Sequence, residues 1–185
     1  MSVIYQRRAV RAFTTAPVDR AAIERLIDAA CQAPSYTDNE PWAFVVLEGA
    51  QKLQRCSDRA KSLFLEHVPA RGVPERLIAE LSDPSFNIFH GARTAIVICA
   101  TSASDQDAED CCLAAENLML AAVALGLGTC PIGLSRPWLR LAETKLELGI
   151  DPDFVPVFTV ALGHPAVAPP PPGRRVPPVR YIQAS

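Results

Sequence analysis

The chain of 185 residues lacks the patterns that mark a membrane protein, a secreted protein or a nucleic-acid-binding protein. Its formal net charge is only −2 at pH 7, so the charge balance gives no reason to expect a nucleic acid as partner. No segment has about 20 consecutive apolar residues, so we expect no membrane span. The N-terminus lacks the apolar core of a secretory signal. The sequence therefore predicts a cytoplasmic protein.

Familiar metal-binding and nucleophile motifs are also missing. The three histidines, His67, His90 and His164, are scattered and have no neighbouring Cys or Glu at ligand spacing. The six cysteines form no C-x-x-C pair and lie mostly in apolar runs, which favours reduced, buried thiols over disulfides. Neither the G-x-S-x-G turn of serine hydrolases nor a P-loop is present. We therefore expect no metal site.

What is present is an alternation of helical and strand periodicities. Helices are predicted at 19–33, 107–126 and 137–150, the first capped by Asp19, and the stretch between 50 and 93 is expected to be partly helical. Strands are predicted at 42–48, 94–100 and 154–163, and a short one after the glycine-rich turn at 126–128. This order predicts an α+β fold, a three-layer α/β/α sandwich, in a single domain spanning 1–185. Residues 166–185 are rich in proline and predict an extended C-terminal arm.

The helix at 107–126 is unusual because it is apolar almost all round from Leu113 to Leu125. Such a helix is buried on more than one side. It is expected either at the centre of the domain or in a subunit interface.

Two clusters of arginine stand out in a nearly neutral chain. Arg7, Arg8 and Arg11 crowd near the N-terminus, and Arg174 and Arg175 follow the prolines of the arm. The planar guanidinium fork binds phosphate well, so both clusters are candidate anion sites. A solvated helix end and a solvated basic tail are the alternative interpretations.

Four stretches of the sequence, taken in order, resemble the FMN-dependent nitroreductase family. They are RRAVRAF (7–13), APSYTDNEPWAFVV (33–46), AAENLMLAAVALGLGTCPIG (114–133), and ALGHP (161–165) with its following arginine pair. The resemblance covers the chain from Val3 to about Ile182. It implies a mixed, mostly antiparallel sheet flanked by helices, and an intertwined homodimer with each flavin at the subunit interface.

The resemblance also implies a set of cofactor-binding positions: Arg7, Arg8, Ala9, Arg11, Pro34, Ser35, Tyr36, Asp38, Pro131, Ile132, Gly133, Arg174 and Arg175. In this interpretation Arg7 and Arg8 bind the FMN phosphate, and Arg174 or Arg175 returns to it from the C-terminal arm. Arg11 reaches the flavin ring near N1 and the C2 carbonyl, where a positive charge favours the reduced flavin. The family usually has serine at the position of Ala9, so one phosphate hydrogen bond is missing.

The loop PSYTDNEPW corresponds to a family segment that approaches the flavin bound mainly by the other subunit. Asp38 and Glu40 replace the usual Asn and Gln, so amide contacts with the ring do not carry over. Asp38 as a turn cap facing solvent, and Trp42 as a core aromatic, are the alternatives.

The turn GLGTCPIG is a poor dinucleotide fingerprint because its glycines follow a helix and precede a strand. In the family interpretation, Pro131, Ile132 and Gly133 pack on one face of the flavin, and a backbone N–H points at N5.

The function implied is an oxidoreductase that takes hydride from NADH or NADPH onto FMN and then reduces a small electron-poor acceptor. Nitroaromatics, quinones, enones and flavins are candidate acceptors. No catalytic side chain is expected, because flavin N5 carries the chemistry. The alternative is a non-catalytic flavin-binding protein for storage, sensing or assembly, suggested by the departures at Ala9 and Asp38.

Overall fold

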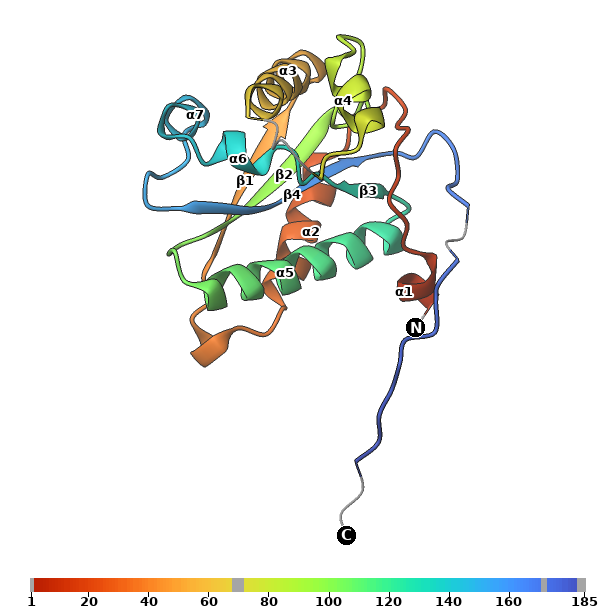
Figure 1. Ribbon diagram of the computed structural model, residues 1–185. Helices are drawn as coiled ribbons and strands as arrows, with labels where there is room; N and C mark the ends of the chain where they lie inside the picture. Colours follow the sequence, from red (N-terminus) through yellow and green to blue (C-terminus); the bar gives the residue numbers. More distant parts are fainter. Residues whose placement is uncertain (1, 68–71, 171–172, 183–185) are drawn as a thin grey trace.

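The computed structural model describes residues 2–67, 72–170 and 173–182 (Figure 1). The helices are α1 (Ser2–Gln6), α2 (Arg20–Cys31), the short 3₁₀ turn η1 (Tyr36–Asp38), α3 (Ala50–Glu66), α4 (Glu75–Ser82), α5 (Asp105–Ala124), α6 (Arg136–Leu139) and α7 (Ala142–Leu148). The strands are β1 (Trp42–Glu48), β2 (Thr94–Ala100), β3 (Gly128–Pro131) and β4 (Val155–Gly163).

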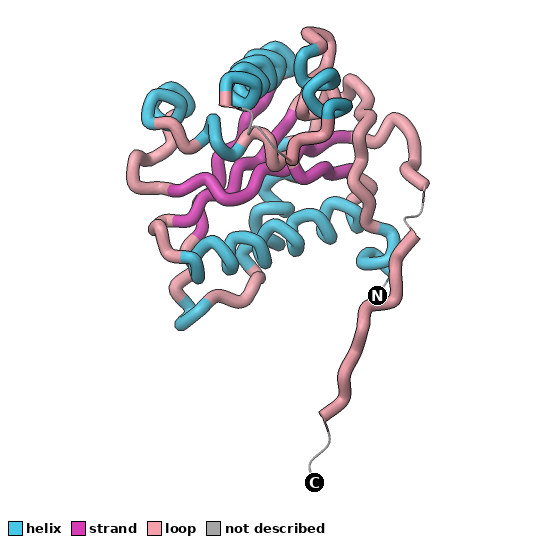
Figure 2. Tube along the Cα trace, viewed as in Figure 1, coloured by secondary structure: helices cyan, strands magenta, loops and turns pink. Residues whose placement is uncertain are grey.

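The four strands form one sheet in the order β1-β2-β4-β3, and each neighbouring pair is antiparallel. Helices cover both faces of this sheet (Figure 2), and every residue of β2 is buried as a result. An isolated parallel bridge joins Ala9 to Thr129, so the N-terminal segment adds a parallel contact along the β3 edge. The predicted three-layer α+β fold is confirmed.

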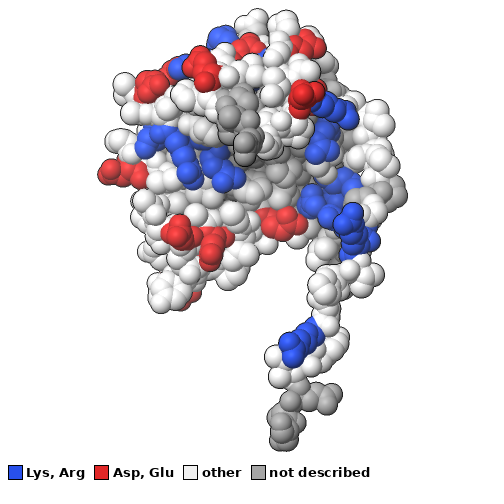
Figure 3. All heavy atoms as spheres, in the orientation of Figure 1, with Lys and Arg blue, Asp and Glu red and all other residues white. Residues whose placement is uncertain are grey.

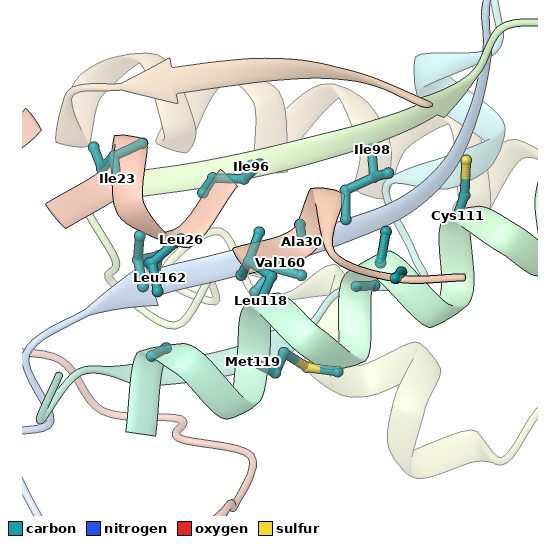
Figure 4. Packing of buried hydrophobic residues seen from close by; sticks show 14 of the residues in the cluster. Ile23, Leu26, Ala30, Ile96, Ile98, Cys111, Leu118, Met119, Val160 and Leu162 are labelled. Atoms are coloured by element: carbon teal, nitrogen blue, oxygen red, sulfur yellow. The ribbon is translucent and has the colours of Figure 1, made fainter. Parts of the chain in front are cut away.

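On one face of the sheet, α2 and α5 pack together over β2 and β4 (Figure 4). Leu26 from α2, Leu118 from α5 and Val160 from β4 are completely buried in this core. Because α5 contacts α1 and α2 as well as the sheet, most of its circumference is covered by protein. This position explains the apolar character of the helix all round, although Leu113 remains 47% exposed.

The other face of the sheet is covered by α3, α4, α6 and α7. Leu53, Leu81, Phe89 and Trp138 fill this second core. The buried Lys61 of α3 donates hydrogen bonds to the carbonyls of Asp83 and Phe86, at 3.1 and 2.6 Å, which holds the loop after α4 in place. Among the described residues, no helix has the length and hydropathy needed to cross a bilayer.

Two local predictions were wrong. Asp19 occupies the N-cap position of α2, but its side chain makes no capping hydrogen bond. The single helix expected at 137–150 is divided into α6 and α7, because Leu141 has an extended backbone with ψ 138°. Trp138 and Leu139 in α6 point into the core, and the chain then turns before α7 begins. Gly149, with φ 69°, ends α7 as expected.

The described part of the C-terminal arm contains no helix and no strand (Figure 1). Its start is fixed to the N-terminal segment, because Ala166 N donates to Ala12 O at 2.9 Å. Farther along, Val176, Tyr181 and Ile182 are at least 86% exposed. The arm therefore leaves the body of its own chain with apolar side chains uncovered.

Candidate functional site

Four of the five predicted arginines lie together in one pocket of about 380 Å³. Basic side chains gather on the right of Figure 3, where the arm leaves the body of the molecule. The lining residues of the pocket are Arg7, Arg8, Ala9, Arg11, Pro131, Pro169, Pro170 and Arg174. They come from the N-terminal segment, the end of β3 and the arm, which are far apart in the sequence. Arg175 is exposed and is not among these lining residues.

The N-terminal segment is held against the edge of the sheet by its backbone. Val10 N donates to Thr129 O at 2.8 Å, and the Val10 side chain is buried. Because side chains alternate along an extended chain, burial of Val10 directs Ala9 and Arg11 away from the side that Val10 occupies. Gly128 permits this close approach, since a Cβ there would lie 2.7 Å from a methyl carbon of Val10.

Two guanidinium groups of the pocket, those of Arg7 and Arg8, already interact with other atoms of the protein. Arg7 forms an ion pair with Glu116 of α5, with Nε and Oε1 separated by 3.4 Å. Arg8 Nη1 donates to the carbonyls of Tyr5 and Arg7, at 2.5 and 2.7 Å. Four arginines opposed by this one paired carboxylate leave an excess of positive charge. The donor set therefore suits a dianionic phosphate.

A second, smaller pocket adjoins the first, because Pro131 lines both. It measures about 90 Å³ and is lined by Pro131, Ile132, Gly133, Arg136, Phe158 and Thr159. Ile132 N donates to Thr159 O at 2.8 Å, and proline has no N–H. In the described structure the Gly133 N–H has no protein acceptor. Of the three predicted residues, only Gly133 can offer a free backbone N–H to a flavin.

The predicted residues Pro34, Ser35, Tyr36 and Asp38 lie elsewhere and line neither pocket. Their loop is fixed near the start of α5, where Tyr36 N donates to the buried carboxylate of Asp110 at 2.9 Å. Asp110 and Glu116 are six residues apart, which corresponds to about 9 Å along a helix axis. One chain therefore carries two separate groups of predicted residues. One is the arginine pocket, and the other is the loop with Pro34, Ser35, Tyr36 and Asp38 (the Ser35 loop).

The Ser35 loop has an unusual backbone. Thr37, Asp38 and Glu40 have φ angles of 54°, 52° and 46°, in the left-handed region that favours glycine and asparagine. Such strained backbone often occurs at binding sites.

The family model described as the nitroreductase family matches residues 4–164. The chain belongs to the nitroreductase family. An Archaeoglobus fulgidus protein with the provisional name NADH dehydrogenase/NAD(P)H nitroreductase is 28% identical over 170 residues, covering 89% of this chain and 84% of the relative.

Solved structures give the same fold. A nitroreductase with bound FMN from Bacteroides fragilis superposes with a TM-score of 0.83, at 23% identity, over 98% of this chain and 97% of that one. An iodotyrosine deiodinase bound to FMN and 3-iodo-L-tyrosine gives a TM-score of 0.79, at 22% identity, over 98% of both chains. Because one fold serves these two proteins, membership of the nitroreductase family does not by itself identify the acceptor.

Three residues near the pockets of this nitroreductase-family chain were missed by the sequence analysis: Glu116, Arg136 and His90. Glu116 had a visible signal, since it is the only charged residue between Leu113 and Leu125. The sequence contains no such signal for Arg136 or His90, because the turns before these residues determine where their side chains lie.

His90 has a left-handed backbone, with φ 56°, and its ring packs edge-on against Phe86 with centroids 6.2 Å apart. Burial, and then the positive charge of Arg11, lower the pKa of His90. The imidazole is therefore neutral at pH 7.

Four of the six cysteines of this nitroreductase-family chain, Cys56, Cys99, Cys111 and Cys130, are buried as expected, whereas Cys31 is half-buried and Cys112 is exposed. Burial raises the pKa of Cys99 to about 11 and that of Cys111 to about 12. Both groups stay protonated at neutral pH and supply no thiolate nucleophile.

Proposed function

We propose that this protein is an FMN-dependent oxidoreductase that takes electrons from NADH or NADPH and reduces a small electron-poor acceptor, such as a nitroaromatic or a quinone. The observation that carries the proposal is the pocket in which Arg7, Arg8, Arg11 and Arg174 meet, next to the turn at Pro131. Membership of the nitroreductase family supports it. So does the NAD(P)H nitroreductase name of the Archaeoglobus fulgidus relative.

The FMN phosphate would be held by Arg7, Arg8 and Arg174. A free phosphate monoester needs several hydrogen-bond donors and positive charges, and these three side chains supply both. Burial raises the pKa of Cys130 in β3, and the positive charge of Arg11 opposes that rise. Burial, and then the same charge, lower the pKa of His90. These effects indicate that Arg11 lies near β3. There it would meet the flavin ring and stabilise the negative charge that reduction adds.

The turn after β3 would support the reactive part of the cofactor. Bound FMN would supply the hydride chemistry, which is centred on N5. Gly133 would donate its free N–H toward that atom, while Pro131 and Ile132 provide an apolar surface for the ring. The hydrogen bond from Ile132 N to Thr159 O fixes this turn against β4.

The remaining predicted residues would come from a second copy of the chain. We propose a homodimer of single domains spanning 1–185, in which the Ser35 loop of one protomer reaches the flavin held by its partner. Asp38 would then face the ring across the interface. The exposed side chains of Val176, Tyr181 and Ile182 in the described part of the arm, and the exposed Leu113 on α5, are surfaces that such a partner would cover.

Titration with FMN and riboflavin, followed by anaerobic mixing with NADH or NADPH, tests the proposal. We expect FMN to bind far more tightly than riboflavin, because only FMN carries the phosphate that the arginines recognise. Equal affinities would refute the phosphate site. Loss of the yellow colour within milliseconds to seconds of mixing with NAD(P)H supports the enzyme. A tightly held flavin that stays oxidised would favour the non-catalytic flavin-binding alternative.

A further inference from the structure

Arg136 has no role in the site described so far. It is an exposed residue at the start of α6, and it lines the small pocket together with Pro131, Ile132 and Gly133. Within the described residues, Arg136 forms no ion pair with a carboxylate and its side chain donates no hydrogen bond to the protein. A positive charge is therefore free beside the turn that supports the flavin in the proposed function.

The base of the Arg136 side chain is firmly held. Its backbone N–H donates to Gly133 O at 3.2 Å, so the residue is fixed to the turn itself. The neighbouring Ser135 is fully buried, and its hydroxyl lies 3.0 Å from both Ile132 O and Thr159 Oγ1. This network joins the turn, α6 and β4, and gives the guanidinium a defined point of attachment.

The proposed flavin leaves the acceptor only the outer side of the pocket. The ring would lie against Pro131, Ile132 and Gly133, whereas Arg136 is exposed. An acceptor carboxylate would therefore meet the guanidinium at the rim of the pocket, beside the flavin and not beneath it. Phe158 offers an apolar contact for the ring edge of the acceptor.

We propose that Arg136 forms a carboxylate-binding subsite, which makes small aromatic acids the preferred acceptors. The inference rests on the proposed function, because the subsite matters for turnover only if reduced flavin lies against Pro131, Ile132 and Gly133. The guanidinium would bind the carboxylate of the acceptor and leave its reducible group over the flavin. Arg136 is then a specificity-determining residue.

The test compares 4-nitrobenzoate with 4-nitrobenzamide, which has nearly the same shape but no charge. Protein reduced with dithionite is mixed with each acceptor, so the result does not depend on NAD(P)H. For Arg136→Gln we expect the second-order rate constant for flavin reoxidation by 4-nitrobenzoate to fall about tenfold, because the acid binds more weakly, while that for 4-nitrobenzamide changes less than about twofold. Arg136→Lys should recover part of the loss, because it keeps the charge without the fork.

The matched control is Arg20→Gln, which removes the same charge from α2, on the opposite face of the sheet. It should leave both acceptors unaffected. An equal effect of Arg136→Gln on the acid and the amide would overturn the proposal. Slower reduction by NADPH but not by NADH in Arg136→Gln would overturn it too, since Arg136 would then bind the nucleotide phosphate.

A binding measurement separates this proposal from the proposed function. 4-Nitrobenzoate should perturb the visible spectrum of the oxidised FMN-loaded protein, and Arg136→Gln should weaken that binding about tenfold. If Arg136→Gln weakens the binding of 4-nitrobenzoate while NAD(P)H fails to reduce the flavin, the carboxylate subsite is supported and the proposed turnover is refuted. If NAD(P)H reduces the flavin but the acid binds no better than the amide, the subsite is refuted alone.

Discussion

Glu116 is expected to oppose phosphate binding, because its carboxylate is already paired with the guanidinium of Arg7. Its Oε1 lies 3.4 Å from Arg7 Nε, and a phosphate oxygen on the same guanidinium would lie at about 2.8 Å. The carboxylate and the phosphate would then be on the order of 6 Å apart. At an effective dielectric constant of about 20, their repulsion is about 3 kcal/mol per unit charge before screening.

Solvent reduces this repulsion considerably, because the side chain of Glu116 is 48% exposed. A net effect of about 1 kcal/mol is reasonable for a pair with this exposure. We therefore expect Glu116→Gln to tighten FMN binding about three- to tenfold. Its effect should shrink in 1 M salt, where the Debye length is about 3 Å.

Flavin fluorescence during titration measures this change. Riboflavin should bind Glu116→Gln and the unchanged protein equally, since it has no phosphate to be repelled. Glu24→Gln is the matched control, because it removes the same charge from the ion pair with Arg20 on α2. If Glu116→Gln binds FMN more weakly, then Glu116 orients Arg7 for the phosphate, and the reasoning from competition is wrong.

Three other variants test the remaining parts of the site. Arg8→Ala should weaken FMN binding about ten- to a hundredfold, the value of a charge-assisted contact, and should leave riboflavin affinity unchanged in the same titration. Removal of the arm from Ala166 onward should loosen the dimer, seen by light scattering, and release FMN in parallel; retention of both would show that the arm is dispensable. Asp38→Asn should raise the flavin midpoint potential by up to about 40 mV, if about 2 kcal/mol of repulsion acts across roughly 8 Å. An unchanged potential would show that Asp38 only faces solvent.

The elements with a simple periodicity were predictable because burial alone determines them. β2 is covered on both faces, so its sequence is a continuous apolar run, and its predicted bounds agree with the structure. The break between α6 and α7 was not predictable in this way. It depends on the extended backbone of Leu141 and on the burial of Trp138 against α3, and neither leaves a glycine or a proline at the break itself.

In the candidate site, too, some features follow from the residues themselves and others depend on the local backbone. Residue chemistry alone left Arg7 and Arg8 as either an anion site or a solvated helix end. The resemblance to a family favoured the anion site and connected the pair with Arg174 across most of the chain. The left-handed residues Thr37 and Asp38 carry no glycine signal, so their conformation could not be foreseen. Arg136 was not predicted because its place beside the small pocket depends on the turn at Gly133, whose carbonyl accepts from the Arg136 backbone N–H.

The placement of the two groups along α5 supports the proposed dimer once the Ser35 loop is assigned to the flavin site, as the family resemblance implies. Glu116 forms an ion pair with Arg7 of the arginine pocket, while Asp110 holds the Ser35 loop. In the proposed function, each chain would therefore supply one half of a site at each of two places on a single helix. A twofold axis repeats every contact between two chains, so one pairing of the loop with the partner's pocket produces two complete sites. A monomer would bring the halves together only by moving the loop along the helix, against the hydrogen bond from Tyr36 N to Asp110. If dilution dissociates the dimer, the flavin should therefore be lost from both sites together, and a monomer that keeps its flavin would show that the arginine pocket is sufficient alone.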